Sequence, residues 1–208
     1  QGRFNLADLV FNNEIDAMAL ERFSRLCAVL NISSAQAQAI ARLVLEKTPK
    51  SPALTSEKPL LIASTPQLRV ITELTATSEI SADLLAALDP YVIVLTRNTN
   101  KPTPINVNTA SAPVLAAIAP LMAQGLAQAI VAQREQTRYF KDRNDFKNTF
   151  PVLQNIDNLD ALITVRSDWF LASGRIEHGK IDMIRQVLIK RSLGHYPSNT
   201  SIIWSRDL

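Results

Sequence analysis

The spacing of apolar residues changes near Thr164 of this 208-residue chain, and this change limits the folds that it can adopt. Over most of the chain before Thr164, apolar residues recur every three or four positions, as they do on one face of a helix. From Trp169 onward they alternate with polar residues, as they do in strands with one buried face. The sequence therefore predicts a helical region followed by β structure, which is an α+β fold class.

The region before the change predicts a series of short helices behind one strand. Gly2–Val10 alternates weakly and is expected to form that strand. Helices are expected over Ile15–Leu30, Ala35–Leu45 behind a Ser33 cap, Thr65–Leu74, Ala82–Leu88 behind a Ser81 cap, Ala112–Ile118 capped by Asn108–Thr109, Ala123–Gln136, and a few residues after an Asp142 cap. Tyr91–Leu95 is β-prone, and Glu46–Ser64 is interpreted as a long surface loop because it holds three prolines.

The region after the change predicts an antiparallel meander. Its strands are expected over Trp169–Glu177, Ile181–Arg191 and Thr200–Ser205, with a turn at His178–Lys180 and a bulge at Gly174. A three-stranded sheet with an apolar face needs cover. The helices before Thr164 pack on one another, so we expect this cover to come from elsewhere, including from upstream of Gln1.

Composition narrows the class of protein. Apolar residues make up 47% of the chain and charged residues 20%, which is typical of a globular protein. The net charge of +3 is too small to indicate a polyanionic partner by itself.

Cys27 is the single cysteine and lies in a helical apolar pattern, so we expect a buried thiol. No apolar run approaches the roughly 18 residues of a membrane span.

The most distinctive local motif is the run INVNTA, residues 105–110, which precedes a helix, a tight turn and a second helix. This arrangement resembles a helix-hairpin-helix unit. In nucleic-acid-binding members of that class, two hairpin glycines let backbone N–H groups approach a phosphate. Here the matching positions hold Leu121 and Ala123, and no Lys or Arg precedes Arg134 in this unit. We expect a packing role, with nucleic-acid binding as the alternative.

No catalytic or metal-binding set is evident among the chemically active residues. His178 and His195 lie in turn-like sequence without a Cys or second His at ligand spacing. Asp142 and Asp145 are explained by capping and charge balance on a short basic helix. The sequence has no GxSxG elbow and no glycine-rich phosphate loop among its 5 glycines. We therefore expect a protein that is not an enzyme.

Several segments in a fixed order resemble one family, the K-type minor pseudopilin of type II secretion, also called general secretion pathway protein K. The GRFNL-like strand is Gly2–Leu6, and the TPINVNTA-like stretch is Thr103–Ala110. The remaining matching segments are Lys58–Leu60, Glu73–Leu74, Pro90–Val92, Tyr139–Phe140, Asp145–Phe146 and a meander that ends at Trp204. The residues that define the two main motifs are Gly2, Phe4, Asn5, Ile105, Asn106, Asn108 and Thr109.

The resemblance implies a pilin-like α/β domain with an antiparallel meander, which carries a large inserted all-α domain with helix-hairpin-helix-like units. Residues 1–12 and 161–208 would form the pilin-like part, and residues 13–160 the insertion. It also implies a hydrophobic N-terminal helix that precedes Gln1, anchors the protein in the membrane and covers the sheet.

The same resemblance implies a structural role at the periplasmic face of the bacterial inner membrane. The protein would join the I-type and J-type minor pseudopilins, cap the tip of the pseudopilus and meet exported substrate proteins, without binding nucleic acid. Many family members carry an aspartate-rich stretch associated with calcium. Here Leu45–Ser64 offers only Glu46 and Glu57, and calcium needs roughly six to eight oxygen ligands, so we expect no cofactor.

Overall fold

The computed structural model describes residues 2–49, 68–74, 80–96, 101–136, 139–178, 181–192 and 199–207. They fall into two compact units, Gly2–Val165 and Arg166–Leu208, which we call the helical unit and the meander unit and describe separately. Each unit has the secondary structure that the periodicity of its sequence predicts, helical in one and β in the other. The predicted α+β fold class is confirmed.

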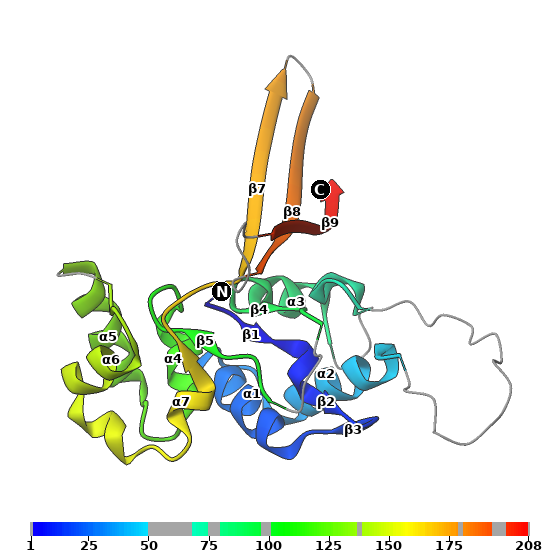
Figure 1. Ribbon diagram of the computed structural model, residues 1–208. Helices are drawn as coiled ribbons and strands as arrows, with labels where there is room; N and C mark the ends of the chain where they lie inside the picture. The colour runs from blue at the N-terminus through cyan, green and yellow to red at the C-terminus, as the bar shows by residue number, and fades with distance from the viewer. Residues whose placement is uncertain are drawn as a thin grey trace, which may run out of the picture. The chain divides into compact units, whose positions relative to one another are not determined.

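The helical unit contains short helices from one end to the other (Figure 1). The α-helices are α1 (Ala17–Val29), α2 (Ser34–Lys47), α3 (Ala82–Leu88), α4 (Ala112–Ile118), α5 (Gln124–Gln136), α6 (Arg143–Thr149) and α7 (Leu159–Leu162). The 3-10 helices are η1 (Leu6–Leu9), η2 (Ile71–Glu73), η3 (Asp89–Tyr91) and η4 (Pro151–Asn155). None of the helices in the described part of the chain has the length and apolarity needed to cross a lipid bilayer.

Side-chain caps explain where four of these helices begin. Asp16, Ser33, Ser81 and Asp142 each accept a hydrogen bond from a backbone N–H in the first turn that follows them. At α2 the cap is reciprocal, because the Gln36 side chain also accepts from the Ser33 N–H. The predicted caps at Ser33, Ser81 and Asp142 are therefore confirmed.

The helices enclose one apolar core. Phe23 and Cys27 on α1, Ile40 on α2 and Leu115 on α4 are fully buried in it. Contacts between α1, α2 and α4 hold the centre of the unit, and Figure 1 shows α1 and α4 side by side. Burial raises the pKa of the Cys27 thiol to about 12, which keeps it protonated and unreactive at neutral pH.

Three pairs of two-residue strands connect distant segments of the helical unit. β1 (Phe4–Asn5) runs parallel to β4 (Val92–Ile93), and β5 (Ile105–Asn106) runs parallel to β6 (Ile163–Thr164). β2 (Val10–Phe11) and β3 (Glu14–Ile15) form an antiparallel hairpin. Its two turn residues, Asn12 and Asn13, have φ of 52° and 64°, the left-handed geometry that a tight two-residue hairpin requires.

The meander unit is the three-stranded antiparallel sheet that the alternation predicts. Its strands are β7 (Trp169–His178), β8 (Ile181–Ser192) and β9 (Asn199–Asp207), in the order β7-β8-β9. The register places Phe170, Ile189 and Ile202 side by side, and Leu171, Leu188 and Trp204 side by side on the opposite face. Each face of the sheet therefore carries apolar side chains.

Several predicted element boundaries are wrong. The strand predicted over Gly2–Val10 is only two residues long, because the Asn5 side chain accepts from the Ala7 N–H and starts the 3-10 helix η1. Ile15 lies in β3 rather than in α1, and only Val92–Ile93 of the predicted strand Tyr91–Leu95 is extended in a ladder. Gly174 pairs regularly with Arg185, and the irregularity in the sheet lies instead between Leu188 and Ile189.

Two further predictions fall partly or wholly outside the described residues. Of the helix predicted over Thr65–Leu74, the described part shows only the 3-10 helix η2. Most of the Glu46–Ser64 loop lies outside the described residues, as does His195.

The predicted domain division stays a prediction. Residues 2–12 belong to the helical unit, where β1 pairs with β4, and this unit ends at Val165. The grouping of residues 1–12 with 161–208 in a pilin-like part depends on how the two units are placed relative to each other.

Candidate functional site

The two motifs that the sequence singles out, one at the start of the chain and one about a hundred residues later, meet in the helical unit. A Cβ added at Gly2 would overlap with the backbone of Thr109 and Ala110. Only a residue without a side chain allows the chain to pass this close to residues 109–110. A glycine is therefore required at position 2 because the backbone there packs directly against the second motif.

Asn5 is the centre of a buried polar network that joins three segments. Its Nδ2 donates to Thr103 Oγ1 at 2.8 Å, and lies 3.3 Å from both the Leu95 carbonyl oxygen and the Asp8 carboxylate oxygen Oδ1, which also accept from it. Its Oδ1 accepts from the Leu95 N–H at 2.8 Å. Asn5 thus satisfies both backbone groups of Leu95 where the chain leaves β4.

Asp8 completes this network with its carboxylate. Its Oδ2 accepts from the Thr103 N–H at 2.7 Å and its Oδ1 accepts from the Thr103 hydroxyl at 3.0 Å. Asp8 is 3% exposed, so these bonds replace the water that a carboxylate would otherwise bind. Residues 5–8 are therefore fixed to residues 95 and 103 by hydrogen bonds to both main chain and side chain.

Asn108 forms a second polar network around the INVNTA motif. Its Nδ2 donates to the carbonyl oxygens of Phe140 at 2.9 Å and Val165 at 3.1 Å, and its Oδ1 accepts from the Phe140 N–H at 2.9 Å. Asn106 Oδ1 accepts from the Asn108 N–H, which holds the turn between them. The prediction that Asn108–Thr109 caps α4 is wrong, since the N-cap of α4 is Ser111 and it makes no side-chain cap.

Residues 105–110 therefore hold both ends of the helical unit, and we call them the clamp. The incoming chain lies against Thr109–Ala110 at Gly2. The outgoing chain pairs with the clamp through β6 and β5. Its Thr164 oxygen accepts from the Val107 N–H at 2.9 Å, and its Val165 oxygen accepts from Asn108 Nδ2. Five of the seven motif residues named from the sequence lie in this clamp or against it: Gly2, Ile105, Asn106, Asn108 and Thr109. Asn5 is the centre of the other network, and Phe4 pairs with Val92 and packs on the Phe23 ring.

The hairpin between α4 and α5 has no phosphate cradle. Leu121 is exposed at its turn. Arg134 is the first basic residue of the segment that begins at Ile105, and it donates to the carbonyl oxygens of Val107 and Ala110 at 2.8 and 2.6 Å. Burial lowers the pKa of Arg134, and its guanidinium is committed to the clamp. These contacts give no support to nucleic-acid binding at this hairpin.

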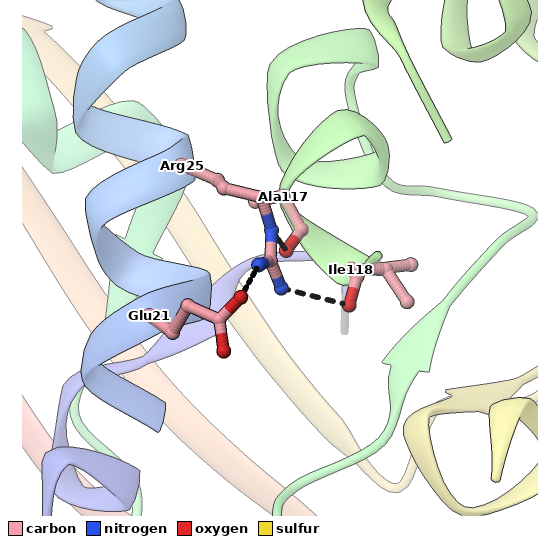
Figure 2. A network of polar contacts seen from close by, with 4 residues as sticks. All are labelled: Glu21, Arg25, Ala117 and Ile118. Atoms are coloured by element: carbon pink, nitrogen blue, oxygen red, sulfur yellow. Dashed lines mark hydrogen bonds and ion pairs between the residues drawn. The ribbon is translucent and has the colours of Figure 1, made fainter. Parts of the chain in front are cut away.

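Arg25 on α1 binds the end of α4 (Figure 2). Its Nε donates to the Ala117 oxygen at 3.2 Å and its NH2 nitrogen donates to the Ile118 oxygen at 3.4 Å, while Glu21 accepts from NH1 at 2.6 Å. The last carbonyl groups of a helix have no partner within the helix and carry partial negative charge. Arg25 therefore caps α4 from a neighbouring helix.

We expect Arg25→Met to lower the free energy of unfolding by about 2 kcal/mol, since it keeps the apolar stem and removes charged hydrogen bonds to two carbonyl groups. Urea unfolding followed by far-ultraviolet circular dichroism measures this change. Glu21→Gln is the control: Glu21 is 66% exposed, so losing its ion pair should cost under about 0.5 kcal/mol. Equal losses in the two variants would mean that the ion pair, and not the cap, stabilises α4.

The described residues hold no cluster of three or more His, Cys, Asp or Glu side chains that could bind a metal ion. Asp142 caps α6, and Asp145 accepts from the Lys141 N–H, so both carboxylates have structural roles. His178 lies in β7 by its backbone. The calcium expectation stays a prediction, because most of the Leu45–Ser64 loop lies outside the described residues.

Sequence reasoning missed three residues of these networks. Asp8 falls within the strand predicted over Gly2–Val10, and Thr103 is only the first residue of the TPINVNTA-like stretch. Arg25 carried no signal at all. An Asp at an apolar position of a weakly alternating strand was the one available sign that a buried polar network surrounds Asn5.

Two family models match the chain, and both are described as Type II secretion system (T2SS), protein K. One covers residues 2–97 and the other residues 105–166, so together they span nearly all of the helical unit. The fold is similar to that of a chain in the crystal structure of the GspK-GspI-GspJ complex from the enterotoxigenic Escherichia coli Type 2 Secretion System. That match has a TM-score of 0.68 and 21% identity, and covers 99% of this chain and 76% of the other. No curated protein sequence matches the chain.

Proposed function

The chain belongs to the protein K family of the type II secretion system, and we propose that it is a minor pseudopilin that caps the tip of the pseudopilus together with I-type and J-type partners. The observation that carries this proposal is the pair of family matches in chain order over residues 2–97 and 105–166. Asn5, Asp8 and Asn108 lie within these ranges, and their polar networks serve packing. The proposed role is therefore structural, with no catalytic step.

The partners are proposed from the similar fold. The protein of like fold is in a complex of GspK, GspI and GspJ. We infer that this chain likewise meets an I-type and a J-type pseudopilin. The family also supports a location at the periplasmic face of the inner membrane, where an apolar N-terminal helix would anchor the protein. At this place the protein would contact exported substrate proteins.

One face of the meander supports a binding role. Phe170, Ile176 and Ile202 are 40%, 61% and 69% exposed and lie on the same face by the strand register. Ala172 and Gly174 lie between Phe170 and Ile176 on this face of β7, and their small size leaves a shallow depression there. Among the described residues, nothing beyond its chain neighbours lies within 4 Å of a Cβ placed on Gly174. A sheet face of this kind is stabilised when an apolar helix or a partner subunit covers it.

The position at the tip follows from how filaments grow. A pilus repeats one heterologous contact, so each subunit along the shaft must leave a face free above and another below. The helical unit, Gly2–Val165, contains most of the chain, and a shaft subunit would have to place this bulk at every repeat. A subunit that carries such a unit fits at an end of the filament.

Immunogold labelling of assembled pseudopili tests this function. The intact protein should label filament ends only, and the double variant Ile176→Lys, Ile202→Lys should lose the label because charges on the meander face oppose its burial against a partner. Val152→Lys, at a residue of the helical unit that is 43% exposed, is the matched control and should still label ends. Label spaced regularly along the shaft would refute the tip position, and end labelling by the double variant would exclude the meander face as the interface.

A further inference from the structure

A cavity of about 540 Å³ opens on the helical unit between α1, the α4–α5 turn and the segment 155–162. We call it the hairpin groove. Its apolar lining includes Met18, Ile118, Pro120, Leu121, Ile156 and Leu162. The volume lies within the range of roughly 300–1,000 Å³ that is usual for binding pockets. All of these residues belong to one unit, so the groove does not depend on the placement of the meander.

Two large apolar side chains are exposed at the groove, one on each side. Met18 on α1 is 74% exposed, and Leu121 at the hairpin turn is 49% exposed. Leu121 occupies the position where a nucleic-acid-binding hairpin would hold glycine to admit a phosphate. The hairpin turn thus presents an apolar side chain in place of backbone N–H groups, which changes the kind of partner that it can accept.

The charges at the groove are arranged by sign. The basic groups are turned inward: the Arg25 guanidinium binds the last carbonyl oxygens of α4, and Arg22 has a buried Nε and also lines the small interior cavity beside Asp8. Of the carboxylates, Asp157 is exposed, Glu21 is exposed and accepts from Arg25 NH1 at 2.6 Å, and Asp16 is half-buried and caps α1. An approaching partner therefore meets an apolar floor edged by negative charge.

From this arrangement we propose that the hairpin groove binds a polypeptide segment that inserts apolar side chains between Met18 and Leu121 and places a Lys or Arg against the exposed carboxylate of Asp157. Apolar area supplies the affinity, and the charges select the partner and its orientation. An anionic group in the same place is disfavoured, because the Asp157 carboxylate would repel it. This surface is distinct from the meander face, so the inference does not rest on the proposed tip position.

Fluorescence anisotropy with three labelled peptides tests the proposal: KALLAK, its acidic counterpart EALLAE, and KAAAAK without the apolar anchors. We expect KALLAK to bind with a Kd of about 100 μM at low salt. EALLAE and KAAAAK should each bind at least about tenfold more weakly, and added salt should narrow the difference between KALLAK and EALLAE. Equal binding of KALLAK and EALLAE, or no binding of KALLAK at millimolar concentration, would overturn the proposal.

Variants at exposed positions locate the binding to the groove. Leu121→Asn and Met18→Gln should each weaken KALLAK binding about tenfold, since each removes an apolar contact of the anchor. Asp157→Asn should weaken the binding of KALLAK, whose lysine faces this carboxylate, and should not weaken the binding of EALLAE, which has no lysine. Val152→Asn, an exposed apolar residue outside the groove, is the matched control and should bind as the unmodified protein does. If Leu121→Asn has no effect, the peptide binds elsewhere and the groove is not the site.

Discussion

Replacing Asn5 with alanine is expected to lower the free energy of unfolding of the helical unit by about 4 kcal/mol. The side chain is 2% exposed, and its loss leaves both backbone groups of Leu95 without their partner. It also removes a donor from the buried Asp8 carboxylate. A buried polar group that loses its partner costs more than the net value of the hydrogen bond, because water cannot replace that partner.

The two units can be followed separately in this experiment. Both tryptophans of the chain, Trp169 and Trp204, lie in the meander, so their fluorescence reports on that unit, while far-ultraviolet circular dichroism is dominated by the helices. Asn5→Ala should shift the dichroism transition to lower urea. Asn148→Ala, at an exposed position on α6, is the matched control and should change it by under about 0.5 kcal/mol. A shift as small as that of the control would show that the Asn5 network does not stabilise the fold.

The second large effect is expected for Asn108→Ala, which should destabilise the helical unit by about 3 kcal/mol. It removes three hydrogen bonds of 2.9–3.1 Å that join the clamp to Phe140 and Val165. Hydrogen exchange gives a local readout, because the Phe140 N–H loses its acceptor and should exchange faster than the amides of α2.

Thr109→Ala is the neighbouring control for this prediction. Thr109 is exposed, and its hydroxyl makes only a long hydrogen bond of 3.5 Å to the Asn106 oxygen, so its loss should cost under about 0.5 kcal/mol. If both variants lower stability equally, the backbone conformation of residues 105–110 matters and the Asn108 amide does not.

Features that depend on nearby residues could be predicted from the sequence. The capping box of α2 joins residues three positions apart, and the Asp142 cap of α6 does the same. The meander follows from an alternation that is visible along each strand. Each of these is decided within a few residues, which is the range over which periodicity and capping signals act.

Features that depend on distant residues could not be predicted in this way. Gly2 lies against residues 109–110, and Asn108 bonds to Val165, 57 positions away. The sequence marks both as motif residues without naming their partners. Because Asn108 precedes a helix, the sequence predicts a cap. In the structure its side chain instead forms tertiary hydrogen bonds, including one to the Phe140 oxygen. The hairpin groove was missed because its walls come from three separate segments.

The clamp also bears on how such a protein can be rearranged. Because Gly2 packs on Thr109–Ala110 and Val165 is bonded to Asn108, the chain enters and leaves the helical unit at neighbouring points. A unit whose two ends lie together can be spliced into a loop of an unrelated host, or have its ends joined and be reopened elsewhere, with little strain on either part. The helical unit thus has the geometry of a transferable cassette, and the six residues of the clamp make that geometry possible.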